Sequence, residues 1–308
     1  MGNRKLYIIG NGFDRHHGIP SGYEHFRKFV QRHDLVLFRA IENYLPARDD
    51  WADLELALAK IVVDNIVTDL EHFMPSYGAE DWSDSGHHDF QYEVQRLVES
   101  LSTELKSQFE SWIRRLRIPT PTTARKRLRT IDPSAIFLTF NYTTMLQKPY
   151  DVPERNILHI HGRAGLPGTD LVLGHAWNPQ ERRSLNDRHD IAEIDTRLME
   201  ANSILDGYFS KTFKPSARLI EEHRPFWERL VGVEEICILG HSLAEVDEAY
   251  FRALLAIPGI ASARWQAACR SENDGRYKRA RLQELGVKAD NISLCSWSEV
   301  LTVHQIKP

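Results

Sequence analysis

Four short apolar runs, each followed by glycine or by a polar residue, constrain most strongly what this chain can fold into. The runs lie at residues 6–9, 136–140, 157–160 and 236–239. Apolar runs of this length are typical of strands that are buried on both faces. Short strands that alternate with helices indicate a mostly parallel sheet with helices on both faces. We therefore expect an α/β chain with a Rossmann-like sheet.

The rest of the chain adds strands and a long helical segment. Further apolar runs predict strands at residues 171–173, 263–268 and 292–297. Between the first two of the four runs, apolar residues recur at three- and four-residue intervals, as at Leu54, Leu58 and Ile61. This spacing is typical of one face of a helix. We expect residues 22–130 to form a large, mainly helical insertion after the first strand, within a single α/β domain at residues 1–308.

Composition and charge disfavour several classes of protein. The 308 residues have a formal net charge of −4, so no overall positive field favours direct binding of nucleic acid. The sequence contains no run of eighteen apolar residues, so we expect no membrane-spanning helix. Cys237, Cys269 and Cys295 lie in apolar runs without a CxxC pair, which indicates buried thiols in a reducing cytoplasm and no metal site.

The residues that follow the four runs form a candidate site. In open α/β sheets, ligands bind outside the carboxyl ends of the strands. Two runs end at residues with chemically active side chains, Asn141 and His161. The other two end in glycine turns, which let a backbone approach a phosphate. These turns contain Gly10, Asn11, Gly12 and Asp14 in one case, and Gly240, His241 and Ser242, followed by Asp247, in the other.

This set of residue types suits a phosphorylated ribose ligand. Glycines admit the phosphates, and Ser242 or Asp247 can form hydrogen bonds with ribose hydroxyls. Asn141 and His161 can hold and activate a water beside the reacting carbon. The GxGxxG fingerprint of dinucleotide-binding proteins is incomplete, because Arg15 replaces its third glycine.

Several motifs, in order along nearly the whole chain, resemble the AbiH family of bacterial phage-defence proteins. One is Ile-Gly-Asn-Gly-Phe-Asp at residues 9–14, and another is Leu-Thr-Phe-Asn-Tyr-Thr at residues 138–143. Further matching motifs lie at residues 17–18, 23–26, 51–55, 159–162 and 239–243 with Asp247. The resemblance implies a role in antiviral defence by abortive infection. It also implies an oligomer or a regulatory protein partner from the same defence system.

The AbiH family in turn resembles, more distantly, the sirtuin-like domains of anti-phage systems, which cleave NAD. That resemblance implies a sirtuin-like sheet, with NAD as the substrate and no required cofactor. It implies that Asn141 positions the nicotinamide ribose or the water and that His161 is the general base. We expect the side chain of His159 to point to the other face of the sheet. The implied ligand-binding residues are Gly10, Asn11, Gly12, Asp14, Thr143, Gly240, His241, Ser242 and Asp247.

The sequence departs from the sirtuin-like pattern at two points. The Asp expected two residues after the asparagine is Thr143 in this chain. The four cysteines of the zinc module of sirtuin deacylases are absent, which favours hydrolysis of NAD over protein deacylation.

Two other functions remain open from the sequence alone. The run Gly-His-Ser-Leu-Ala at residues 240–244 resembles the GxSxG nucleophile elbow of serine esterases, with Ser242 as nucleophile and His304 as the sole later histidine. Alternatively, the same strand ends bind a nucleotide without turnover, so that the chain is a sensor or scaffold in a defence complex.

Overall fold

The computed structural model describes residues 4–76, 78, 88–124, 126–166 and 170–302. The chain divides into two compact units. Unit 1 comprises residues 1–22, 113–172 and 215–308, and unit 2 comprises residues 23–112 and 173–214. The second segment of unit 2, residues 173–214, lies outside the insertion that we predicted at residues 22–130. The expectation of a single domain that carries this insertion stays a prediction.

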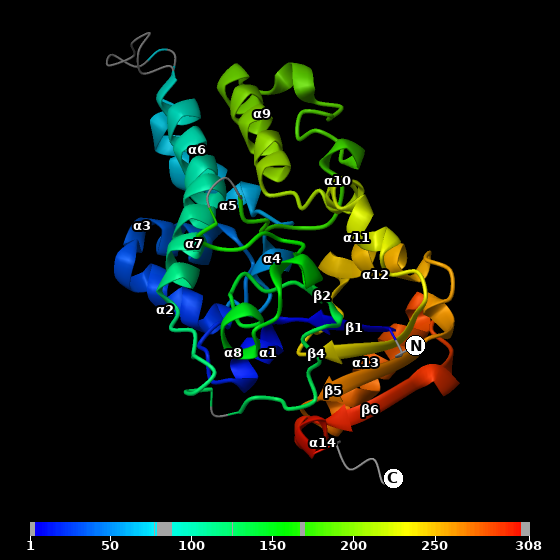
Figure 1. Cartoon of the computed structure of the whole chain (residues 1–308). Coiled ribbons are helices and arrows are strands. Elements are labelled where there is room, and N and C mark those ends of the chain that lie inside the picture. Colours follow the sequence, from blue (N-terminus) through cyan, green and yellow to red (C-terminus); the bar gives the residue numbers. More distant parts are fainter. Residues whose placement is uncertain (1–3, 77, 79–87, 125, 167–169, 303–308) are drawn as a thin grey trace, which may run out of the picture. The chain divides into compact units, whose positions relative to one another are not determined.

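Unit 1 contains the predicted parallel sheet. In the described residues, six parallel strands pair in the order β3-β2-β1-β4-β5-β6 (Figure 1). This order is that of doubly wound folds that bind dinucleotides, so the predicted Rossmann-like fold class is confirmed. The strands are β1 (Arg4–Ile9), β2 (Ile136–Thr139), β3 (Ile157–His159), β4 (Val233–Leu239), β5 (Arg264–Cys269) and β6 (Ile292–Ser296).

The strand predicted at residues 171–173 is wrong. These residues have no strand assignment, although Leu171 and Leu173 are buried. The backbone N–H of Val172 donates to the carbonyl of His161 at 2.9 Å. Its carbonyl accepts from the hydroxyl of Tyr142 at 2.7 Å. A side-chain donor thus takes the place of a neighbouring strand, so this apolar run is buried without the backbone hydrogen bonds of a sheet.

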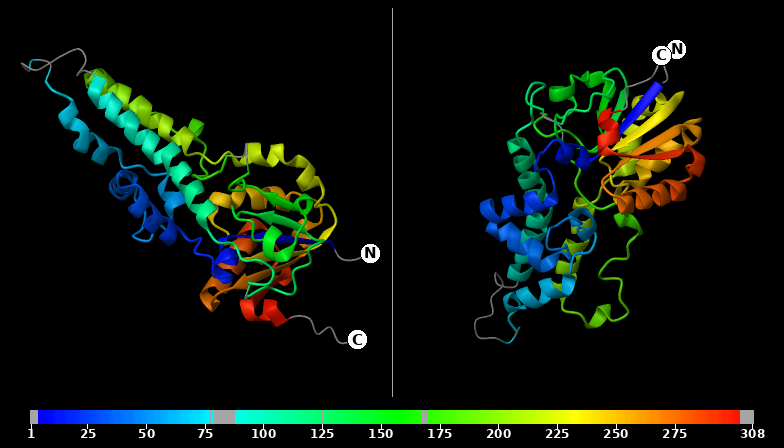
Figure 2. Two further views of the ribbon diagram at one scale, coloured as in Figure 1. Left: turned by 60° about the vertical axis from the view of Figure 1, so that its left-hand side comes forward. Right: turned by 90° about the horizontal axis from the view of Figure 1, so that it is seen from below.

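Alternate residues of the strands face two separate hydrophobic cores. Leu6, Ile8 and Ile236 pack with residues of α10, α11, α12 and α13. Tyr7 and Ile9 pack on the other face with residues of α1 and α8, and with α14 at its edge. The sheet is therefore covered on both faces, as we predicted (Figure 2). The helices of unit 1 are α1 (Asn11–His16), α8 (Gln147–Tyr150), α10 (Ser216–Glu222), α11 (Arg224–Glu228), α12 (Glu248–Leu255), α13 (Glu272–Leu285) and α14 (Trp297–Thr302).

Unit 2 is helical in its described part. A π-helical turn at Ser100–Glu104 joins α6 to α7, and α9 packs along α6 although the two are far apart in the sequence (Figure 1). No helix in the described part of the chain is both long and apolar enough to cross a membrane. The helices of unit 2 are α2 (Tyr23–His33), α3 (Leu35–Tyr44), α4 (Leu54–Ala57), α5 (Val63–Leu70), α6 (Asp89–Glu99), α7 (Leu105–Arg115, which continues into unit 1) and α9 (Thr196–Lys211).

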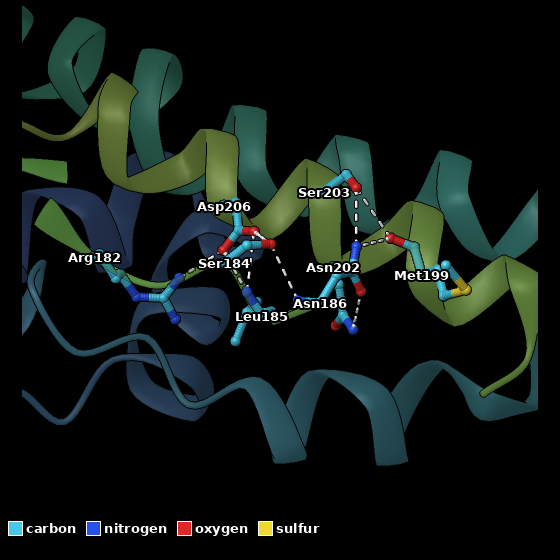
Figure 3. Close-up of polar contacts among 8 residues, drawn as sticks. All are labelled: Arg182, Ser184, Leu185, Asn186, Met199, Asn202, Ser203 and Asp206. Carbon is cyan, nitrogen blue, oxygen red and sulfur yellow. Dashed lines mark hydrogen bonds and ion pairs between the residues drawn. The ribbon is translucent and has the colours of Figure 1, made fainter. Parts of the chain in front are cut away.

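A carboxylate on α9 holds the loop that precedes this helix. Asp206 accepts from the guanidinium of Arg182 at 2.5 Å and from the hydroxyl of Ser184 at 2.6 Å. It also accepts from the backbone N–H of Leu185 at 3.1 Å (Figure 3). Asn186 then donates to the carbonyl of Met199 at 2.8 Å. These bonds fix the loop along the helix.

A buried ion pair ties together distant segments of unit 2. Lys214 is fully buried, and its ammonium lies 2.5 Å from the carboxylate of Glu55. The hydroxyl of Tyr23 donates to the other carboxylate oxygen at 2.5 Å. Tyr23 and Glu55 both come from the family motifs identified in the sequence. In this structure they join the beginning of α2 to α4 and to the end of the second segment.

Candidate functional site

The turns that follow β1, β2, β3 and β4 start at one rim of the sheet, because these parallel strands are neighbours. The prediction that these four apolar runs form one parallel sheet is confirmed. Asn141 and His161 follow adjacent strands, β2 and β3. The candidate residues therefore share the rim at which ligands bind in this class of fold.

The two glycine turns pack directly against each other. The N–H of Gly12 donates to the carbonyl of Gly240 at 2.8 Å. A Cβ added at Gly10 would lie 2.4 Å from the Cα of His241, and one at Gly240 would lie 2.1 Å from the nitrogen of Phe13. Gly240 also has φ of +76°. These glycines therefore have a packing role whether or not they also contact a phosphate.

Asp14, Asn141 and Thr143 form one buried polar cluster, which we call the amide cluster. The side-chain Nδ2 of Asn141 donates to one oxygen of Asp14 at 2.9 Å, and the hydroxyl of Thr143 donates to the other at 2.7 Å. Asp14 is 1% exposed. Burial raises the pKa of its carboxyl to about 7, against the lowering effect of the two hydrogen bonds.

The bond to Asp14 fixes the orientation of the Asn141 amide. With Nδ2 directed at the carboxylate, the carbonyl Oδ1 points elsewhere. This oxygen is buried and has no hydrogen-bond partner among the residues that the structure describes. Buried polar atoms are nearly always satisfied by protein or by ordered water. The amide cluster thus presents one acceptor to a hydroxyl or a water.

The geometry also explains why position 143, where the sirtuin-like pattern has aspartate, is threonine in this chain. Its hydroxyl is a donor placed on the carboxylate of Asp14. An aspartate at position 143 would bring a second carboxylate against a buried first one, and two such groups cannot both ionise at close range. In this chain, Asp14 therefore supplies the carboxylate beside Asn141, and threonine is the compatible residue at position 143.

His161, Asp247 and His241 form a second cluster, which we call the imidazole cluster. Nε2 of His161 lies 3.6 Å from one oxygen of Asp247, and Nε2 of His241 lies 3.3 Å from the other. Both histidines are 3% exposed and Asp247 is 8% exposed. One carboxylate therefore lies between two buried imidazoles.

The backbone selects the tautomer of His241. Its Nδ1 accepts from the N–H of Leu243 at 2.9 Å, so that the proton of the neutral ring resides on Nε2, facing Asp247. This bond depends on the turn after β4, where Leu243 has φ of +60°. A non-glycine residue with positive φ is uncommon and persists where the surroundings enforce it. The turn thus orients His241, and His241 lies against Asp247.

An aromatic side chain packs against both histidines of the imidazole cluster. Phe140 immediately precedes Asn141, and its ring centroid is 5.3 Å from that of His161 and 4.3 Å from that of His241. The ring of Tyr250 on α12 also lies 5.4 Å from His161. Sequence reasoning missed Tyr250, because a helical tyrosine in an apolar stripe has the signature of an ordinary core residue.

His159 and His161 lie in different surroundings, although they are only two residues apart. Residues i and i+2 of a strand share a face. The two side chains separate because β3 ends at His159 and the chain turns at Gly162, which has φ of +84°. Nδ1 of His159 bonds the carbonyl of Asn141 at 2.9 Å, and Nε2 bonds Gln147 at 2.9 Å. Burial lowers the pKa of His159 to about 4, so its ring is a neutral support for Asn141.

Two of the predicted site residues, Asn11 and Ser242, belong to neither cluster. The amide of Asn11 donates to the carbonyl of Ser21 at 2.9 Å and accepts from its hydroxyl at 2.5 Å, which closes the turn after α1. Ser242 is exposed. In the turn after β4, the left-handed residues are Gly240 and Leu243, and the serine between them is not left-handed. His304, the partner that the esterase interpretation requires, lies outside the described residues.

Comparison with known protein families gives a match over most of the chain. The family model described as bacteriophage abortive infection AbiH matches residues 6–268. This range includes all residues of both clusters. No curated protein and no solved structure matches the chain.

Proposed function

The chain belongs to the AbiH family of bacteriophage abortive-infection proteins, and we propose that it acts in this defence by hydrolysing NAD to nicotinamide and ADP-ribose. The family places the chain in phage defence. The chemistry is our inference from the residues at the rim of the sheet. The proposal includes no tightly bound cofactor, because the leaving group of NAD is already a cationic pyridinium.

The observation that most supports the proposal is the buried Oδ1 of Asn141, which has no partner among the described residues. Glycosidic bonds break through an oxocarbenium-like state, in which contacts to ribose hydroxyls and to water become stronger. An acceptor that is held in place by Asp14 and by His159 meets this need. Preorganised groups of this kind stabilise developing charge without reorganising.

The imidazole cluster can supply the base. In the proposed reaction, the bond between nicotinamide and C1′ of the ribose breaks, and its electron pair leaves with nicotinamide and neutralises the ring. The oxygen of a water forms a bond to C1′, and His161 takes one proton from that water and releases it to solvent. Asp247 stabilises the imidazolium that forms, as carboxylates beside catalytic histidines do.

The test compares the wild type with Asn141→Ala and His161→Ala in bacteria challenged with phages, because free NAD hydrolysis would harm an uninfected cell. We expect cellular NAD to fall and nicotinamide to rise on infection with the wild type. Removing a positioned acid–base group typically lowers the rate by roughly 10²–10⁴-fold, so both variants should lose the response. His189→Ala, at an exposed histidine of unit 2, is the control that should retain it.

Two results would contradict the proposal. One is full NAD loss in both variants. The other is wild-type protection against phage with unchanged NAD, which would favour a nucleotide-binding sensor without turnover. Equal abundance and circular dichroism spectra of the variants would separate loss of chemistry from loss of folding.

A further inference from the structure

A cavity of about 620 Å³ opens at the carboxyl ends of β5 and β6. It shares no lining residue with the amide cluster or the imidazole cluster, although it lies at the same rim of the sheet. Its wall includes Cys269 and Cys295 from the strand ends, Leu294 from β6 and Gly275 from α13. A cavity of this size in unit 1 accommodates a small organic molecule.

The wall of this cavity is apolar and closely fitted. A Cβ added at Gly275 would lie 3.2 Å from Cδ1 of Leu294 and 3.6 Å from the sulfur of Cys269. Glycine at this position therefore keeps α13 close to the strands. Burial raises the pKa of Cys269 and raises that of Cys295 to about 11, so both are neutral thiols near pH 7.

The mouth of the cavity is polar and carries both signs of charge. Arg270 and Arg276 contribute guanidinium groups, and Glu272 and Glu299 contribute carboxylates. Ser271 caps α13 by accepting from the N–H of Asp274 at 3.2 Å. Guanidinium groups bind phosphate oxygens, and carboxylates accept hydrogen bonds from sugar hydroxyls and from amino groups. An apolar wall with such a mouth suits a flat base attached to a sugar phosphate.

The strand order relates the cavity to the two clusters. Doubly wound sheets of this order consist of two halves, and a dinucleotide lies across both. Asn141 and His161 follow strands of the half that contains β1, β2 and β3, whereas the cavity belongs to the other half. Strands β2 and β5 are three strand spacings apart, about 14 Å. A group bound in the cavity is therefore remote from Asn141, whereas the imidazole cluster extends to the end of β4, which neighbours β5.

We propose that this cavity binds the adenosine monophosphate half of the NAD substrate. The proposal rests on the proposed function for the identity of the dinucleotide. It makes the chain selective for a dinucleotide over nicotinamide mononucleotide, because binding energy from the remote half would hold the reacting half in place.

The two cysteines in the wall provide a test on the unmodified protein. Labelling with a small neutral thiol reagent at pH 8.5, followed by peptide mass spectrometry, reports on Cys269 and Cys295 separately from Cys237 in β4. At a ligand concentration of about ten times Kd, a fully protected thiol should be labelled about tenfold more slowly. We expect this protection by AMP, and none by nicotinamide mononucleotide or by inorganic phosphate.

A matched pair of arginine variants examines the mouth of the cavity. Arg276→Ala should weaken binding of AMP about tenfold and that of adenosine much less, since a charge-assisted contact to phosphate is lost. Arg252→Ala, which removes an exposed arginine of α12 outside the cavity, should leave both affinities unchanged.

The outcomes separate this proposal from the proposed function. Protection of both cysteines by AMP in a protein that never cleaves NAD would support the cavity and refute the hydrolase. The cavity proposal would be overturned if the chain cleaves NAD but neither AMP nor ADP-ribose protects the two cysteines from labelling. Both ligands are tested at the concentration at which NAD saturates turnover. Equal protection by nicotinamide mononucleotide would also overturn it.

Discussion

The buried carboxyl of Asp14 should make the stability of unit 1 fall as pH rises from 5 to 7. Burial raises its pKa to about 7 in the folded chain, whereas an unfolded aspartate titrates near ~3.9. The folded state thus binds this proton more tightly than the unfolded state does. The stabilising contribution is fully present below the unfolded pKa and is lost as pH rises through the folded pKa.

The size of the effect follows from linkage. Between pH 5 and 7, the unfolded carboxyl is ionised and the folded one is mostly protonated, so the free energy of unfolding falls by up to about 1.4 kcal/mol per pH unit. Over this range the loss from Asp14 amounts to roughly 2 kcal/mol. Histidines such as His17 and His159 act in the opposite sense, because burial lowers their pKa values to about 4. The wild-type curve alone therefore mixes both effects.

The Asp14→Asn variant isolates the contribution of Asp14. Its side chain can still accept from Asn141, and its amide can donate to the hydroxyl of Thr143. Urea unfolding at several pH values should show the difference between wild type and variant shifting by about 2 kcal/mol in favour of the variant from pH 5 to 7. Asp290→Asn, at an exposed aspartate, is the control and should show no such trend.

A difference between wild type and Asp14→Asn that does not change with pH would refute this reasoning. An independent measurement is the NMR titration of the Asp14 carboxyl in the folded protein. An inflection near the ordinary aspartate value would show that the amide cluster binds an ionised carboxylate near pH 7, and that its hydrogen bonds offset the cost of burial.

Three further substitutions test the packing around the site and in unit 2. Gly240→Ala should prevent folding or lower the free energy of unfolding by several kcal/mol. Gly259→Ala, also at positive φ but with open space around it, should lower it by only about 1–2 kcal/mol. Equal losses in thermal unfolding would show that the contact between the two glycine turns is dispensable. Thr143→Val should lower stability by roughly 1–3 kcal/mol at pH 8 and by less at pH 5, where Asp14 is protonated; a loss independent of pH would exclude the bond to the carboxylate. Lys214→Met should destabilise unit 2 by about 3–5 kcal/mol, because it leaves the carboxylate of Glu55 without its cation. The double variant with Glu55→Gln should be destabilised by clearly less. A loss in the double variant equal to the sum of the two single losses would contradict this account.

The fold class was predictable from the sequence because strand burial is a local property of composition. Runs such as residues 6–9 and 236–239 are apolar on both alternating faces, and a parallel sheet covered on both sides buries both. The same signal failed at residues 171–173, where an apolar run is buried without a neighbouring strand. A run of three residues carries too little information to distinguish these cases.

The sequence by itself determined that Asn141, His161 and the glycine turns follow strands of one parallel sheet, and hence lie at one rim. Only the tertiary structure decided which of them meet. Asp14 contacts Asn141 across 127 positions of the chain. Asp247 lies between His161, which follows β3, and His241, which follows β4. Strand order depends on the paths of the crossovers, which no local pattern encodes. For the same reason the cavity at β5 and β6, and the joining of residues 173–214 to the helices of unit 2, came from the structure alone.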